Sequence, residues 1–72
     1  MSHYFEIIGQ NNLTVELGVD DISRSVIVRG NQLCANGRVL GEFETHERAE
    51  QIFNELVEAH SSGEEYFKVP ED

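Results

Sequence analysis

The residues best suited to chemistry in this chain are three histidines and a single cysteine. His46 and His60 fall at opposite ends of one predicted helix, about 21 Å apart along its axis, which is too far to share a metal ion. Cys34 stands alone, so an internal disulfide is excluded, and no neighbouring base in the sequence activates its thiol. No glycine-rich loop opens the helix to cradle a phosphate. We therefore expect no metal, no cofactor and no enzymatic activity.

Carboxylates are the most abundant functional groups, with fourteen Asp and Glu against five Lys and Arg and a net charge of −9. Residues 1–36 hold four acids against two arginines, whereas residues 37–72 hold ten acids against three bases. Nucleic acids and anionic membranes attract positively charged proteins, so we expect the chain to bind neither directly. An acidic surface favours a protein partner with a basic surface.

The clearest predicted element is an amphipathic helix over residues 46–60. At about 100° per residue, its apolar side chains gather on one face and its polar side chains on the other. Thr45 supplies an N-cap hydroxyl, and Gly63 suits the left-handed position that follows a helix. We expect the apolar stripe to pack against a sheet, with Phe53 and Leu56 the most buried. The stripe consists of Ala49, Ile52, Phe53, Leu56 and Ala59.

Helix stability does not explain where the acids lie on this helix. Glu47 and Glu50 are in the first turns, where the helix dipole favours them, but Glu55 and Glu58 lie toward the C-terminus, where it does not. Glu55 and Glu58 also form a like-charge pair, which costs about 0.2–0.5 kcal/mol. Two interpretations stay open: a solvated face that maintains solubility, or a surface that binds a partner's arginines and lysines. The candidate partner-binding residues are Glu47, Glu50, Glu55, Glu58, Glu64 and Glu65.

The rest of the chain is typical of short β-strands joined by turns. Asn36-Gly37 favours a type I′ turn, which closes a two-residue hairpin, and Pro70 ends the last strand. The fold class is therefore α+β in a single domain, residues 1–72. We expect an antiparallel five- or six-stranded sheet, built as a meander of hairpins, with one amphipathic helix packed on one face. Strands are expected over residues 3–9, 13–17, 25–29, 32–35, 38–43 and 65–69.

Self-association is a second expectation, because a domain of 72 residues has a marginal core. The third predicted strand places Val26 and Val28 on one side and Ile27 on the other, and Val39 faces away from Leu40. Such residues are either ordinary scattered surface aliphatics or a second apolar patch for a homodimer or another partner. A two-fold symmetric dimer through the sheet or its edge is the commonest closed arrangement.

The expected location is the cytoplasm. No apolar run approaches the 18 or more residues of a membrane helix, and Met1-Ser2-His3 does not read as a signal peptide. A single cysteine also fits a reducing compartment.

The stretch from Leu40 to Ala49, followed by the helix and then by Tyr66–Pro70, resembles a class of short phage and prophage proteins of Gram-positive bacteria. That class has no assigned activity or catalytic residues, so the resemblance carries over no site. It implies a mobile-element origin in a bacterial host. Small acidic phage proteins include inhibitors of host defence, some of which imitate nucleic acid. The matching residues are Gly41, Phe43, Thr45, Glu47, Ala49 and the tail through Pro70.

The sequence thus predicts a small acidic, non-enzymatic protein–protein interaction module that serves a phage or mobile element as an accessory protein. The alternative is an inhibitor of a host defence nuclease, of the anti-CRISPR type, whose carboxylates stand in for phosphates on a basic groove. Salt separates the two hypotheses. Affinity that comes from an apolar patch survives added salt, whereas affinity that comes from charge is lost as the charges are screened.

Overall fold

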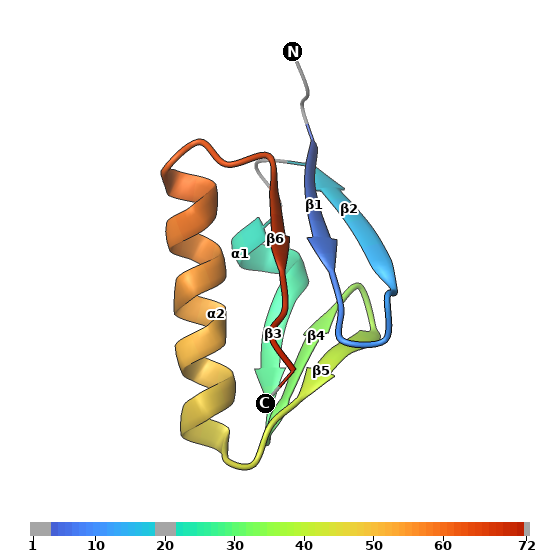
Figure 1. The fold of residues 1–72 in the computed structure, drawn as a ribbon, viewed down its shortest axis with the longest axis vertical. Helices are drawn as coiled ribbons and strands as arrows, with labels where there is room; N and C mark the ends of the chain where they lie inside the picture. The colour runs from blue at the N-terminus through green and yellow to red at the C-terminus, as the bar shows by residue number, and fades with distance from the viewer. Residues whose placement is uncertain (1–3, 19–21, 72) are drawn as a thin grey trace.

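The computed structural model describes residues 4–18 and 22–71 and has the α+β architecture expected (Figure 1). His3, in the first expected strand, and residues 19–21 lie outside the described residues. None of the helices in the described part of the chain combines the length and the apolar character needed to cross a membrane. The elements are β1 (Tyr4–Ile8), β2 (Thr14–Gly18), α1 (Ile22–Ser25), β3 (Val26–Arg29), β4 (Gln32–Ala35), β5 (Arg38–Glu42), α2 (His46–Ser61) and β6 (Tyr66–Lys68).

The strands divide into two three-stranded sheets, in place of the expected single sheet. One sheet has the order β2-β1-β6 and is called the β1 sheet; the other has the order β3-β4-β5 and is called the β4 sheet. The expectation of wholly antiparallel pairing is also wrong, because β6 runs parallel to β1. The short helix α1 lies between β2 and β3 and replaces the hairpin turn that would have paired them. The long helix α2 connects β5 to β6, so that β6, near the C-terminus, lies beside β1, near the N-terminus.

Two of the hairpins, β4–β5 and β1–β2, follow the local sequence. Asn36 and Gly37 both have positive φ, 52° and 78°, as a type I′ turn requires. The β1–β2 hairpin pairs Phe5 with Leu17 and Ile7 with Val15, which places these four buried side chains on one face. The strands expected over residues 3–9 and 13–17 are therefore present, as β1 and β2, with buried and outward-facing side chains in alternation.

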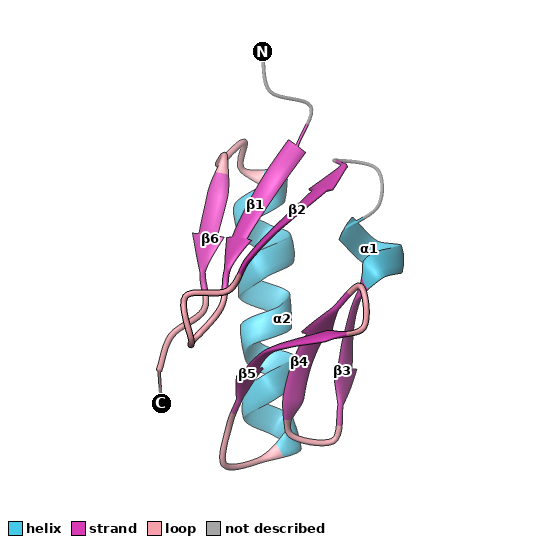
Figure 2. Cartoon of the chain, turned by 90° about the vertical axis from the view of Figure 1, so that its right-hand side faces the viewer, coloured by secondary structure: helices cyan, strands magenta, loops and turns pink. Residues whose placement is uncertain are grey.

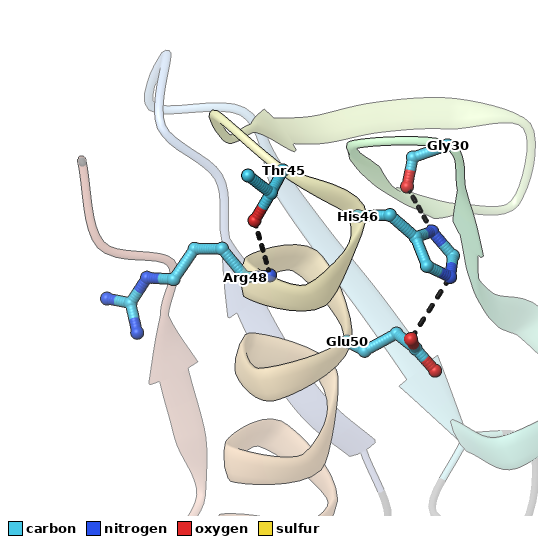
Figure 3. A network of polar contacts seen from close by, with 5 residues as sticks. All are labelled: Gly30, Thr45, His46, Arg48 and Glu50. Carbon is cyan, nitrogen blue, oxygen red and sulfur yellow. Dashed lines mark hydrogen bonds and ion pairs between the residues drawn. The ribbon is translucent and has the colours of Figure 1, made fainter.

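Helix α2 begins and ends where its caps predict. The Thr45 hydroxyl accepts a hydrogen bond from the backbone N–H of Arg48 at 3.1 Å (Figure 3). The helix extends one residue beyond the predicted end, to Ser61, and Gly63 has the expected positive φ of 88°. Figure 2 shows the strands of both sheets on the same side of α2. The inner faces of both sheets and the apolar stripe of α2 therefore enclose a single core.

The most buried residues of α2 are Ala49, Ile52 and Leu56, each with no exposed surface. The prediction for Leu56 is confirmed, but the prediction that Phe53 is among the most buried is wrong. Phe53 is only partly buried and packs at the edge of the core. It lies about 100° around the helix from Ile52, so it falls at the margin of the buried stripe. The fully buried side chains of the core include Phe5, Ile7, Val26, Leu33, Leu40, Ile52, Leu56 and Val69.

Gln10, in the turn between β1 and β2, joins the two sheets to the C-terminal segment. Its backbone N–H donates to the carbonyl oxygen of Leu40 at 2.7 Å, and its side-chain oxygen accepts from the N–H of Glu42 at 2.9 Å. Its side-chain nitrogen donates to the carbonyl oxygens of Pro70 at 2.9 Å and Glu42 at 3.3 Å. The backbones approach closely here, since a Cβ on Gly9 would lie 2.8 Å from the Leu40 oxygen.

The N-cap of α2 allows a direct prediction. Replacing Thr45 with alanine removes the acceptor for the Arg48 N–H and should lower the free energy of unfolding by about 1 kcal/mol. Urea denaturation followed by circular dichroism measures this loss. Thr45→Ser is the matched control, because it keeps the hydroxyl and should retain most of the parent stability. An equal loss in both variants would show that the hydroxyl is not what stabilises this end of the helix.

Candidate binding groove

An open groove lies between the C-terminal end of α2 and β6, which adjoin each other in Figure 1. Its volume is about 490 Å³, which falls within the range of roughly 300–1,000 Å³ typical of ligand sites. Because the groove is open to solvent, it suits a side chain from a partner protein better than a small molecule, which would need a more enclosed site. The groove is lined by Glu55, Glu58, Ala59, Ser62, Glu64, Tyr66 and Phe67.

Three carboxylates line this groove because of local backbone geometry. Glu55 and Glu58 are one turn apart on α2, so they project from the same side of the helix. The helix then ends in a hydrogen-bonded turn, in which the N–H of Ser62 donates to Glu58 O and the N–H of Glu64 donates to Ala59 O. Gly63, with its positive φ, allows the reversal. The turn brings Glu64 to the same groove as the two helical glutamates.

Strand β6 contributes two aromatic residues to the lining of the groove. Tyr66 and Phe67 are neighbours in β6, so their side chains leave opposite faces of the strand. Phe67 packs against the core, whereas Tyr66 is 57% exposed. The face of a tyrosine ring attracts cations. Tyr66 therefore borders the groove from the outer side of β6, where a positively charged side chain bound to the carboxylates would lie near its ring.

Tyr66 also borders a second acidic surface, on the outer face of the β1 sheet. Glu6 stands directly opposite Glu16 in the β1–β2 pair and beside Tyr66 in the β1–β6 pair. The N–H of Glu6 donates to the carbonyl oxygen of Glu65 at 3.1 Å, which holds Glu65 next to it. Like charges directly opposite each other destabilise a sheet by roughly 0.2–1 kcal/mol. We call this surface the outer acidic patch; it comprises Tyr4, Glu6, Glu16, Glu65 and Tyr66.

Sequence reasoning missed Glu6 and Glu16, although a signal for them was present. Both lie between buried residues of an alternating strand, so both had to face outward, and the predicted hairpin placed them on one face. No such local signal could place Tyr66 beside Glu6, because β6 pairs with β1 across almost the whole length of the chain.

The structure brings four of the six predicted partner-binding residues to this end of the molecule. Glu55, Glu58 and Glu64 line the groove, and Glu65 belongs to the outer acidic patch. Glu47 and Glu50 lie nearer the start of α2. Glu47 precedes Glu55, and Glu50 precedes Glu58, by eight residues, which is about 12 Å along the helix axis. Glu50 is engaged there in a contact with His46, with 3.1 Å between Oε1 and Nε2.

His46, His60 and Cys34 are each accounted for by structural contacts or by burial. His46 contacts the Gly30 carbonyl oxygen through Nδ1, so it ties the start of α2 to the β3–β4 turn (Figure 3). The His60 ring meets the Phe5 ring edge to face, with 5.3 Å between the ring centroids. Cys34 is buried in β4. Within residues 4–18 and 22–71, no three His, Cys, Asp or Glu side chains gather closely enough to hold a metal ion.

Comparison with known proteins gives no relative for this chain: it matches no protein-family model, no curated protein and no solved structure. The groove and the charges around it are therefore the features of this chain that bear on its function.

Proposed function

We propose that this chain is a small, non-enzymatic protein-binding module whose groove between α2 and β6 holds an arginine- or lysine-bearing segment of a partner protein. The observation that carries the proposal is the convergence of Glu55, Glu58 and Glu64 on one open groove beside the exposed ring of Tyr66. Among the described residues, these three carboxylates have no ion pair. A cation from outside the chain would supply one.

Each contact that this groove offers is weak, so a partner needs several of them to bind with useful affinity. A cation over an exposed tyrosine ring gains about 0.5–1 kcal/mol, and an exposed ion pair gains about 0.2–1 kcal/mol. The strongly negative net charge of −9 adds long-range attraction, which raises the association rate of a basic partner. A segment with several basic side chains is therefore a better match than one amine.

A second candidate function is inhibition of a nucleic-acid-binding defence protein, with the carboxylates standing in for phosphates. It is favoured by the continuation of the acids from the groove through Glu65 to Glu6 and Glu16. A phosphate mimic would need both surfaces at once, so changing Glu6 and Glu16 would weaken binding as much as changing Glu55 and Glu58. Under both candidate functions, an origin in a mobile element and a location in the cytoplasm of a bacterial host stay predictions.

Changing Glu55 and Glu58 together to glutamine tests the groove. The double variant should be as stable as the parent or more stable by a few tenths of a kcal/mol, because a like-charge pair is removed from the helix. Its affinity for a blocked peptide of alternating arginine and glycine should fall about tenfold at low salt, which corresponds to two exposed charge contacts. Isothermal titration calorimetry at low and high salt measures this loss.

The matched control is Glu44→Gln with Glu47→Gln, which removes the same charge near the opposite end of α2. Both control residues are exposed, and neither lines the groove. The control should keep nearly the parent affinity. If both double variants lose affinity equally, net charge alone attracts the peptide and the groove has no special role. Unchanged peptide affinity in both double variants would contradict the proposal.

A further inference from the structure

The groove runs along the free edge of β6. In the sheet order β2-β1-β6, β6 pairs with β1 and, among the described strands, with no other, and Figure 2 shows it as the outermost strand of the β1 sheet. Tyr66 and Phe67 both line the groove, although neighbouring side chains of a strand point to opposite faces. A groove that reaches both faces lies at an edge, and the edge toward β1 is occupied. The groove therefore adjoins the edge of β6 that points away from β1.

The hydrogen bonds between β6 and β1 show which backbone groups at this end of the chain are already paired. The N–H of Glu6 donates to the carbonyl oxygen of Glu65 at 3.1 Å, and the N–H of Val69 donates to the carbonyl oxygen of Ile8 at 2.8 Å. The backbone polar groups of successive residues in a strand point to alternate sides. Glu65, Phe67 and Val69 therefore direct their backbone polar groups toward β1.

Tyr66 and Lys68 direct their backbone N–H and C=O groups to the opposite side, toward the groove. Both residues are exposed, and in the part of the chain that the structure describes neither has a hydrogen-bond partner at that edge. The edge of β5, by comparison, is closed by Gln10, whose N–H donates to Leu40 O and whose side chain accepts from the N–H of Glu42. An open strand edge is a template for pairing with another strand.

We propose that the basic segment held by the groove binds as an extended strand, paired through its backbone with the open edge of β6. This mode of binding rests on the proposed function of the groove and adds the conformation that the partner segment adopts. When a peptide adds a strand to an exposed sheet edge, main-chain hydrogen bonds give affinity and alternate side chains give specificity. Here Tyr66 and Lys68 supply two N–H donors and two C=O acceptors.

Alternation along the added strand specifies the side chains of the partner. The inner face of β6 packs on the core through Phe67, so side chains on the inner face of an added strand would lie beside Glu55 and Glu58 of α2. Side chains on its outer face would lie beside Tyr66 and Lys68, and the positive charge of Lys68 disfavours a basic residue there. The partner segment therefore carries arginine or lysine at every second position, with uncharged residues between.

Methylating alternate backbone nitrogens of the peptide tests this strand pairing on the parent chain. Successive N–H groups of an extended peptide point to opposite sides, so only the arginine set or only the glycine set of the blocked arginine–glycine peptide can reach β6. Three peptides of equal charge are compared by isothermal titration calorimetry at low salt: unmodified, methylated on every glycine nitrogen, and methylated on every arginine nitrogen. One methylated peptide should keep nearly the affinity of the unmodified peptide, and the other should bind about tenfold more weakly or worse.

The outcomes separate strand pairing from the groove itself. Equal affinity of the two methylated peptides, whether retained or lost, would overturn strand pairing. If the two bind alike while Glu55→Gln/Glu58→Gln still weakens the unmodified peptide, the groove holds basic side chains without pairing to β6. If the parent chain does not bind the unmodified peptide, both proposals fail.

Proline at position 68 tests the same edge from the side of the protein. Lys68→Pro removes an N–H that points away from β1, so the pairing of β6 with β1 should be retained. The unmodified peptide should bind this variant about fivefold more weakly, because one donor is lost at the edge. Lys68→Ala removes the charge but keeps the N–H, and it should bind the basic peptide slightly more tightly than the parent. Circular dichroism confirms that both variants are folded, and equal affinity of the two folded variants would contradict the pairing.

Discussion

Replacing Leu56 with alanine should lower the free energy of unfolding by about 3–4 kcal/mol. Leu56 has no exposed surface and lies in the core that α2 forms with both sheets. Truncating a fully buried leucine costs roughly 2–5 kcal/mol, because the transfer free energy is lost and a cavity remains. A domain of 72 residues has a total stability of only about 4–11 kcal/mol, so this variant should be close to unfolding at 37 °C. Urea denaturation gives the value.

Phe53→Ala is the informative comparison. Its side chain is larger, but it is only partly buried at the edge of the core, so less apolar surface returns to water on truncation. We expect it to lose about half as much stability as Leu56→Ala, near 1–2 kcal/mol. A larger loss at position 53 than at position 56 would mean that the helix presents a different face to the sheets.

Replacing Gln10 with alanine should lower the free energy of unfolding by about 2–3 kcal/mol. The change removes three side-chain hydrogen bonds to Glu42 and Pro70, each worth about 0.5–1.5 kcal/mol. It also disconnects the β1–β2 turn, β5 and the C-terminal segment from one another. Hydrogen exchange should show the additional opening first at Glu42 and Val69, whose segments Gln10 connects.

The control is Gln32→Ala, which removes one exposed side-chain hydrogen bond, to Glu42. That loss should stay below about 0.5 kcal/mol, as for most surface substitutions. If the two alanine variants were equally stable, Gln10 would not connect the sheets in the way that its contacts indicate.

The parts of this fold that could be predicted from the sequence are those with local causes. The length of α2 follows from the apolar spacing between Thr45 and Gly63, and both caps are found where the residue types place them. The Asn36-Gly37 turn needs only the positive φ that these two residues tolerate. The burial of Phe53 was overestimated because hydrophobicity alone does not show which side of the apolar stripe faces the sheets.

The parts that could not be predicted depend on contacts between distant residues. The pairing of β6 with β1 joins residues about sixty positions apart, and no local pattern encodes whether that pairing is parallel. Gln10 looks like an ordinary turn residue, and its role depends on partners 32 and 60 positions away.

The residues of the candidate site fall into the same two groups, those with a local cause and those that depend on distant contacts. The pair Glu55 and Glu58 could be recognised from its unfavourable position on a helix. The contribution of Tyr66 could not, because it requires the β1–β6 pairing.

Mapping where a basic peptide binds tests the central claim most directly. The blocked arginine–glycine peptide is titrated into the chain at low salt, and the backbone amide resonances are followed by heteronuclear NMR. Binding in the groove predicts that the largest shifts fall at Glu55, Glu58 and residues 62–67, with little change at Glu44 and Glu47. Shifts of equal size at both ends of α2, or no saturable shifts at all, would contradict a specific binding groove between α2 and β6.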